Sequence, residues 1–193
     1  MKSKIAIFLS IFAISSQVIF GQSQAFSHQK SSKDIIIHVV GDVHGEKAIK
    51  REALPTLKKY FKSGDLNIFN LETAVTDANV KEEKEYNFKT DLAFLKALKE
   101  IGFNVATVAN NHSYDYGLPG FMDTLQSLKA AEISYVGGGK NSESAYHGRV
   151  YKVRGMRIGV LGFAKVNGGP DSIAKKDKPG ITDGYDARST ESA

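Results

Sequence analysis

Short hydrophobic runs recur along the chain at spacings that leave room for a helix between them. Residues 35–40 form a continuous run rich in β-branched side chains, which is typical of a strand buried on both faces. Apolar runs at 66–71, 103–108 and 133–136 predict three further strands. The chain therefore alternates predicted strands with longer intervening segments.

The intervening segments predict helices. A polar helix candidate covers 47–62, where Pro55 must start or kink the helix. A second helix is predicted to begin after Asp91, whose carboxylate can accept a hydrogen bond from the first turn, and to end at Gly102. A third carries an apolar stripe at helical spacing, formed by Phe121, Leu125 and Leu128.

Strands that alternate with helices predict an α/β fold built on a layered sheet. In such sheets ligands bind in the loops beyond the carboxyl ends of the strands, so functional side chains should follow the first three strands. Residues 150–153 and 156–163, joined around Gly155, predict a β-hairpin instead. Beyond Lys165 the chain shows no clear period, and we expect the layered domain to be incomplete at its C-terminal end.

The N-terminal residues predict export. Lys2 and Lys4 precede a ten-residue apolar run and small residues follow, so residues 1–25 are interpreted as a signal peptide. An uncleaved membrane anchor is the alternative, although the run is shorter than the ~20 apolar residues of a spanning helix. Residues 26–33 would be a polar tether and residues 34–193 the folded domain, which would be periplasmic, held at the cell surface or secreted.

Composition narrows the chemistry. The chain has no cysteine, which excludes disulfides, thiol catalysis and a Cys-ligated zinc site. The formal net charge of +5 falls to +3 when the signal peptide is removed. Because the remaining lysines form no basic stripe with interleaved aromatic residues, nucleic acid is not expected as a partner.

Candidate metal ligands follow the first two strands. Asp42 and His44 lie two residues apart, so an extended backbone points both side chains to the same side. A carboxylate beside an imidazole suits zinc, iron or manganese. Glu72 stands at the mouth of the second strand, where a carboxylate is costly unless it is paired or bound to metal. The alternative is that Glu72 accepts hydrogen bonds from a helix N-terminus.

The third strand leads into the most specific string of the chain, Ala-Asn-Asn-His-Ser-Tyr-Asp-Tyr-Gly at 109–117. The amide oxygen of Asn111 can ligate a metal, and His112 beside it can donate a proton. Asp115 lies three residues further on and can orient the imidazole. An Asn-rich turn with a surface histidine would explain the asparagines, but not the coincidence with the other two loops.

Taken together, Asp-x-His, a carboxylate and Asn-His, each after a strand, resemble the calcineurin-like metallophosphoesterase superfamily. The details resemble its CapA-type branch, the family of capsule and poly-gamma-glutamate synthesis proteins. They are Asn-Leu-Glu at 70–72, the string at 105–117, Tyr-Val-Gly-Gly-Gly-Lys-Asn-Ser-Glu-Ser-Ala at 135–145 and Gly-Met-Arg-Ile-Gly-Val-Leu-Gly-Phe at 155–163. The resemblance spans residues 35–181 and implies a metallophosphatase-like layered α/β/β/α sandwich.

The resemblance also implies a site with two divalent metal ions, which could be manganese, iron or zinc. Asp42 and His44 would hold one ion, Glu72 would bridge the two, and Asn111 would hold the second. A water between the ions would be the nucleophile of a phosphoesterase-like hydrolase.

By the same resemblance, His112 and Asp115 would be the catalytic groups outside the metals. His112 would stabilise the phosphoryl group or protonate the leaving oxygen. The expected partners are an anionic surface polymer or a phosphoester substrate, together with membrane-bound machinery of polymer synthesis.

One departure from the family pattern leaves alternatives open. The family's later half supplies further histidines, whereas this chain has none after His147. Three or four ligands are too few for two ions, because each needs roughly four partners. Either the domain continues beyond Ala193, or the site is degenerate and the chain is a non-catalytic polymer-binding or scaffolding module. A third alternative is a secreted nucleotidase-like phosphatase, whose site would use metal ions in the same way.

Overall fold

A computed structural model describes residues 34–45 and 54–185 and shows an α/β architecture, as predicted. Its centre is a parallel four-stranded sheet in the order β1-β2-β5-β6. The bounds of these strands are β1 (Ile37–Val43), β2 (Leu66–Leu71), β5 (Val105–Thr107) and β6 (Ser134–Val136). The predicted signal peptide and tether lie outside the described residues. Within the described part, no helix is long and apolar enough to cross a membrane.

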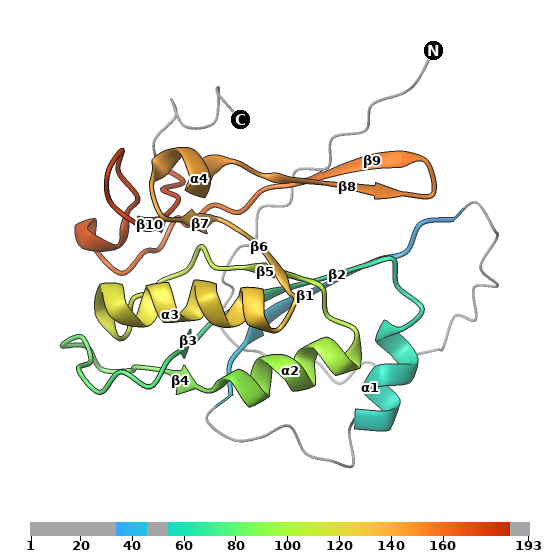
Figure 1. The fold of residues 1–193 in the computed structure, drawn as a ribbon, viewed down its shortest axis with the longest axis horizontal. Coiled ribbons are helices and arrows are strands. Elements are labelled where there is room, and N and C mark those ends of the chain that lie inside the picture. Colours follow the sequence, from blue (N-terminus) through green and yellow to red (C-terminus); the bar gives the residue numbers. More distant parts are fainter. Residues whose placement is uncertain (1–33, 46–53, 186–193) are drawn as a thin grey trace, which may run out of the picture.

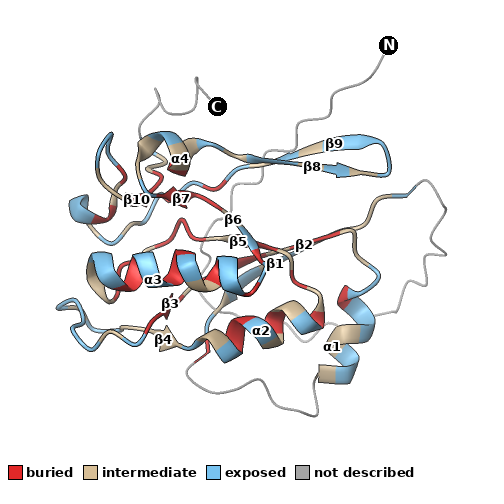
Figure 2. Cartoon of the chain, in the orientation of Figure 1, coloured by how far each residue is buried: buried red, intermediate tan, exposed pale blue. Residues whose placement is uncertain are grey.

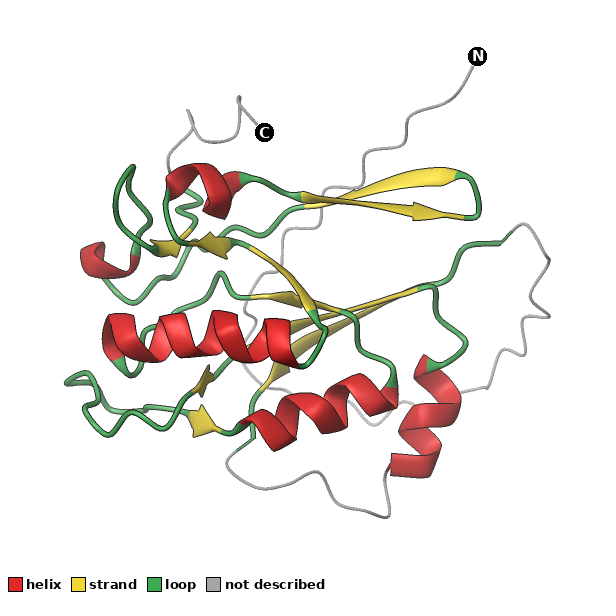
Figure 3. Cartoon of the chain, in the orientation of Figure 1, coloured by secondary structure: helices red, strands yellow, loops and turns green. Residues whose placement is uncertain are grey.

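Three helices cover one side of the sheet (Figures 1 and 3). They are α1 (Leu54–Phe61), α2 (Leu92–Ile101) and α3 (Gly117–Ala130). The helix predicted at 47–62 begins at Leu54 in the described part, with Pro55 in its first turn, where its missing N–H costs no helical hydrogen bond. Residues 46–53 lie outside the described residues.

The predicted ends of the second helix are confirmed. Asp91 Oδ1 accepts a hydrogen bond of 3.0 Å from the backbone N–H of Phe94, which satisfies one of the free donors of the first turn. Gly102 ends the helix with φ of 124°, a conformation that side chains with a Cβ rarely adopt. The next strand therefore begins at a fixed place.

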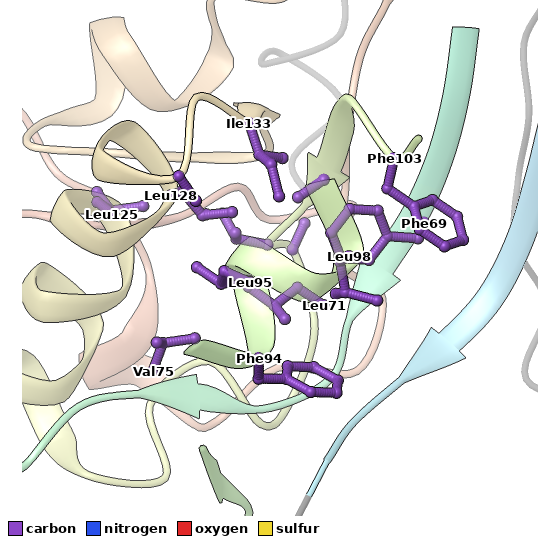
Figure 4. Close-up of a cluster of buried hydrophobic side chains, with 14 of the residues drawn as sticks. Phe69, Leu71, Val75, Phe94, Leu95, Leu98, Phe103, Leu125, Leu128 and Ile133 are labelled. Atoms are coloured by element: carbon purple, nitrogen blue, oxygen red, sulfur yellow. The ribbon is translucent and has the colours of Figure 1, made fainter. Parts of the chain in front are cut away.

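The hydrophobic core lies between the sheet and these helices. Figure 4 shows α2 and α3 turning their apolar stripes toward β2, and Figure 2 shows the same faces as buried. Phe121, Leu125 and Leu128 are all buried, as their helical spacing predicts. The core cluster also includes Phe69, Leu71, Leu95, Leu98, Ile101 and Ile133.

The prediction that the first strand is buried on both faces is wrong. In the part of the chain that the structure describes, β1 is an edge strand with β2 as its neighbour, and its residues are half-buried or exposed. Val39 keeps 40% of its surface exposed. A continuous apolar run predicts burial only when neighbours cover both faces, and the helices lie on one. β1 also runs on to Val43 past an irregularity between Val39 and Asp42, which carries Asp42 into the sheet edge.

The remaining elements lie between β2 and α2 and after β6. Short strands β3 (Ala74–Val75) and β4 (Lys89–Thr90) pair with each other, as do β7 (Gly138–Gly139) and β10 (Gly180–Ile181). The predicted hairpin is confirmed as antiparallel β8 (Arg149–Val153) and β9 (Met156–Val160), with Gly155 in its turn at φ of 82°. Helix α4 (Ser142–Tyr146) and a 3-10 turn (Pro170–Ser172) are the other elements of the described residues.

We call residues 34–45 and 54–137 the sheet half and residues 138–185 the hairpin half. The two meet at a close backbone crossing between Gly137 and Gly162. A Cβ on Gly137 would lie 2.7 Å from the Cβ of Ala109 and 3.2 Å from the Gly162 backbone. The buried Thr182 joins both strands of the crossing, because its N–H donates to the Gly137 oxygen (3.1 Å) and its hydroxyl to the Gly162 oxygen (2.7 Å).

Candidate active site at the carboxyl edge of the sheet

The parallel strands bring the predicted side chains to one edge of the sheet. Asp42 of β1 is in register with Asn70 of β2, and Asn70 is in register with Thr107 of β5. Glu72 directly follows β2, and the string 109–117 follows β5. The site therefore lies at the carboxyl ends of three adjacent strands, where an α/β sheet places its ligands.

Asn70 forms hydrogen bonds with both carboxylates of this edge. Its side-chain Nδ2 donates to Asp42 Oδ1 at 2.8 Å and also to Glu72 Oε2. Its Oδ1 accepts a hydrogen bond of 2.9 Å from Asn110 Nδ2, which also donates to the Leu71 carbonyl at 2.9 Å. Both asparagines are buried, and together they hold the Asp42 and Glu72 carboxylates through a satisfied hydrogen-bond network.

The pKa of the Glu72 carboxylate is shifted by its position at this edge. Its pKa is raised from 4.5 to about 7, mainly by burial and then by the nearby charges of Asp42 and Asp115, against the lowering effects of the hydrogen bond from Asn70 and the charge of Lys84. Negative charge is therefore unfavourable here in the protein alone. A divalent cation would relieve that repulsion.

His112 stands at the mouth of the same edge. Its Nδ1 lies 2.8 Å from Asp115 Oδ2, and its Nε2 lies 4.0 Å from Glu72 Oε1. Asp115 is fully buried, and His112 and Glu72 each leave little of their side chains exposed. The structure thus places Asp115 where it can orient the imidazole, with the other ring nitrogen facing the carboxylates.

The loop that carries His112 is shaped by Asn110. The Asn110 Oδ1 accepts from the His112 N–H at 3.0 Å and from the Ser113 hydroxyl at 3.1 Å. Tyr114 packs on Phe121 with ring centroids 4.8 Å apart, and its hydroxyl donates to the Pro179 carbonyl at 2.8 Å. Burial raises the pKa of Tyr114 to about 12, so this tyrosine stays protonated and structural.

Two predicted ligands lie at the rim of this arrangement. The His44 imidazole stacks on the Phe88 ring, with centroids 4.6 Å apart and an interplanar angle of 11°. Asn111 is half-buried and its carbonyl accepts a hydrogen bond of 2.9 Å from Lys84 Nζ. Across residues 34–45 and 54–185, no three side chains of His, Cys, Asp or Glu come close enough together to hold a metal ion.

The donor chemistry nevertheless suits a hard or borderline divalent cation. Asp42 and Glu72 offer carboxylate oxygens on either side of one amide, and a cation would offset the charge that raises the Glu72 pKa. For such a cation the described residues would supply part of a coordination shell.

Sequence reasoning missed three residues that build the site. Asn110 was passed over for its neighbour Asn111, although the same string contains both. Lys84 and Phe88 come from a polar segment between β3 and β4 that carries no strand or helix pattern. Their role depends on a fold-back onto 109–117, which no local pattern predicts.

Comparison with known proteins gives a match along nearly the whole chain. The family model described as "Bacterial capsule synthesis protein PGA_cap" matches residues 22–192. The chain is 34% identical over 153 residues to the "PGA biosynthesis protein CapA" of Bacillus subtilis, a match that covers 74% of this chain. It is 32% identical over 167 residues to the "Capsule biosynthesis protein CapA" of Bacillus anthracis, covering 79% of this chain.

A more distant relative has a related description. A "probable polyglutamine synthesis accessory protein" of Mycobacterium tuberculosis is 31% identical over 134 residues, which is 67% of this chain and 35% of the relative. The chain spans 40% of the length of each of the two Bacillus relatives.

Proposed function

We propose that this chain, which belongs to the bacterial capsule synthesis protein PGA_cap family, takes part in poly-gamma-glutamate synthesis through a metal-dependent hydrolase site. The site is the carboxyl edge of β1, β2 and β5. The observation that carries the proposal is the joining of Asp42 and Glu72 by the Asn70 amide, with the Asp115–His112 pair directly beside them.

The residues that would hold divalent ions are Asp42, His44, Glu72 and Asn111. When bound, such ions would lower the pKa of a water molecule and polarise a phosphoryl oxygen. Asp42 and Glu72 contribute the negative charge that selects a cation, and the buried Asn70 and Asn110 amides keep both carboxylates in place. The metallophosphatase-like α/β/β/α sandwich is part of this proposal, supported by the parallel sheet and by these loops.

His112 would act as the acid for the leaving oxygen. Asp115 would accept the hydrogen bond of Nδ1–H, so in the protonated ring the proton for transfer would sit on Nε2, the nitrogen that faces Glu72, and its transfer would leave a neutral ring with its proton on Nδ1. We propose a phosphoester or the anionic surface polymer as the substrate, and the membrane-bound polymer machinery as a partner. Export follows from the predicted signal peptide, and N-terminal sequencing of the protein from culture medium or periplasm tests it: an intact Met1 would contradict cleavage.

A non-catalytic polymer-binding or scaffolding module is the second candidate. The observation that favours it is that the described residues do not bring three His, Cys, Asp or Glu side chains together. In that case the carboxyl edge would bind the polymer machinery without turnover.

Metal binding and turnover separate the two candidates. Titration calorimetry of the full chain with Mn²⁺, followed by hydrolysis of bis(p-nitrophenyl) phosphate, should show binding and metal-dependent turnover. Glu72→Gln should weaken Mn²⁺ binding by more than the roughly 10–100-fold that loss of a group bonded to a ligand costs, and should lose turnover with it, because a ligand to the ions is gone. Glu83→Gln, which changes an exposed carboxylate, is the matched control.

His112→Ala should retain Mn²⁺ binding and lose turnover by about 10²–10⁴-fold. Undiminished metal affinity in Glu72→Gln would contradict the bridging role. Metal binding without turnover in the unmutated chain would favour the binding module.

A further inference from the structure

A segment outside the predicted site folds over His112. Between β3 and β4 the chain forms a strap, residues 76–88, that is fastened at several points. The Thr76 hydroxyl donates to Asp123 Oδ2 at 2.5 Å, and the Glu82 N–H donates to the Asp115 carbonyl at 2.9 Å. Asn87 Nδ2 donates to the Glu82 and Lys84 carbonyls at 3.2 and 3.1 Å, so the position of Lys84 is built into the strap.

The strap brings a cation and an aromatic ring to the Asp115–His112 pair. Lys84 Nζ forms an ion pair with Asp115 Oδ1 and donates to the Asn111 carbonyl at 2.9 Å. The Phe88 N–H donates to Asp115 Oδ2 at 2.5 Å, and the Phe88 ring lies 4.3 Å from the His112 ring. Asp115 is therefore a fully buried carboxylate whose ionised form is supported by an ammonium group and a backbone donor.

An ionised carboxylate accepts hydrogen bonds and donates none. The contact of 2.8 Å between Asp115 Oδ2 and His112 Nδ1 then requires the proton to be on Nδ1. Lys84 Nζ also lies 3.5 Å from Nδ1 and could donate to it only if that nitrogen carried no proton. The shorter contact determines which nitrogen carries the proton, because a distance of 2.8 Å is that of a full hydrogen bond and 3.5 Å is at the limit of one.

We propose that Lys84 is a positioning residue that selects the Nδ1–H tautomer of neutral His112. By keeping Asp115 ionised, Lys84 leaves the lone pair of Nε2 directed at the edge where Glu72 lies, 4.0 Å away. The use of this tautomer in catalysis rests on the proposed function, whereas the tautomer itself does not. Nothing in the sequence pattern marks Lys84, since it is one of five consecutive charged residues at 81–85.

Nitrogen-15 NMR of the full chain labelled at histidine tests the proposal directly. The chain has five histidines, and the His112 signals are those lost in His112→Gln. At a pH where the His112 ring is neutral, Nδ1 should resonate in the protonated range and Nε2 in the unprotonated range. The opposite assignment in the unmutated chain would overturn the proposal.

Variants of Lys84 test its part in the selection. Lys84→Met leaves Asp115 buried without its cation, so Asp115 should take up a proton and donate it to Nδ1, which shifts His112 to the Nε2–H tautomer. Lys84→Arg keeps the cation and should retain the Nδ1–H tautomer. An unchanged tautomer in Lys84→Met would overturn the role of Lys84. If Lys84→Met does not fold, Lys84→Gln is the substitute and the same two outcomes apply.

Lys89→Met is the matched control. Lys89 lies at the end of the strap, and its ammonium also donates to a backbone carbonyl, that of Ala78 at 2.9 Å, but its second contact is the Tyr116 ring rather than Asp115. This variant should leave the His112 tautomer unchanged; a shift equal to that of Lys84→Met would overturn the assignment to Lys84.

Turnover separates this inference from the proposed function. If the chain hydrolyses a phosphodiester, Lys84→Met should lower kcat by about 10–100-fold and leave KM nearly unchanged, because the acid–base group is misdirected while binding is intact. Without any turnover, the proposed hydrolase fails and the NMR result still decides the tautomer.

Discussion

The two halves of the molecule are stabilised differently. Of the largest side chains that are fully buried in the described residues, all but Ile181 belong to the sheet half. The hairpin half leaves Val150 57% and Met156 50% exposed. The sheet half therefore has a core of its own and carries the candidate site on one edge. The hairpin half adds Ala164 and Ile181 to that core and is otherwise held by backbone pairing and by its crossing with the sheet half, so mutations should affect the two halves very unequally.

The largest expected effect is the loss of a core side chain in the sheet half. Phe69→Ala removes a ring that has no exposed surface and should lower the free energy of unfolding by about 3–5 kcal/mol. Urea unfolding followed by circular dichroism measures this change. Phe163→Ala, at a ring 36% exposed in the hairpin half, is the matched control and should cost about 1 kcal/mol or less. Equal losses at both positions would contradict the unequal division of the core.

The next effect is a dependence on pH that belongs to the sheet half alone. Because the Glu72 pKa is raised from 4.5 to about 7 in the folded chain, the folded state binds more protons than the unfolded state between these values. The free energy of unfolding should therefore fall as the pH rises from 4.5 to about 7, by roughly 2–4 kcal/mol, and this group should add nothing further above that. Glu72→Gln should remove this dependence and leave the chain more stable at pH 8.

Urea titrations at several pH values, without added metal, measure this dependence. Asp171→Asn in the hairpin half is the control, since Asp171 is fully exposed and its pKa is lowered by its hydrogen bond and charge interaction with Lys178. If the free energy of unfolding still falls as steeply between pH 4.5 and 7 in Glu72→Gln, the dependence on pH belongs to another group.

The smallest expected effect is on the outer surface of the hairpin. Val150→Thr keeps the β-branched shape in an antiparallel strand and changes a side chain that is mostly exposed, so the free energy of unfolding should change by less than about 0.5 kcal/mol. Thermal unfolding of the two proteins side by side measures the difference. A loss above about 2 kcal/mol would show that this face is covered in the molecule under test.

Local patterns were sufficient to predict most elements of the fold. The spacing of Phe121, Leu125 and Leu128 predicted α3, and Asp91 with Gly102 predicted both ends of α2. Helix faces and caps could be predicted because they depend on residues that are close together in the sequence. The burial of β1 was predicted wrongly because the number of neighbours of a strand is a tertiary property. A run of β-branched residues can form an edge strand, as β1 does, as well as a central strand.

The candidate site could be predicted in part for the same reason. Strand ends are local, so Asp42, Glu72 and the 109–117 string were identified and lie at one edge of the sheet. The role of Asn110 over Asn111 depends on which amide faces Asn70, and the contacts of Lys84 depend on a strap that pairs with residues about thirty positions away. Contacts between residues so far apart in the sequence depend on the folded arrangement, and no local hydrophobic pattern predicts them.

The Gly137–Gly162 crossing has a consequence for how the two halves can change over time. At this place the halves approach as bare main chain, with Thr182 bonded to both peptides, so their spacing here is set by peptide dimensions. A glycine at position 137 therefore has to be retained while other positions of both halves change. A single added methyl there would act as a wedge between the halves, because it would meet the Ala109 Cβ at 2.7 Å and the Gly162 backbone at 3.2 Å.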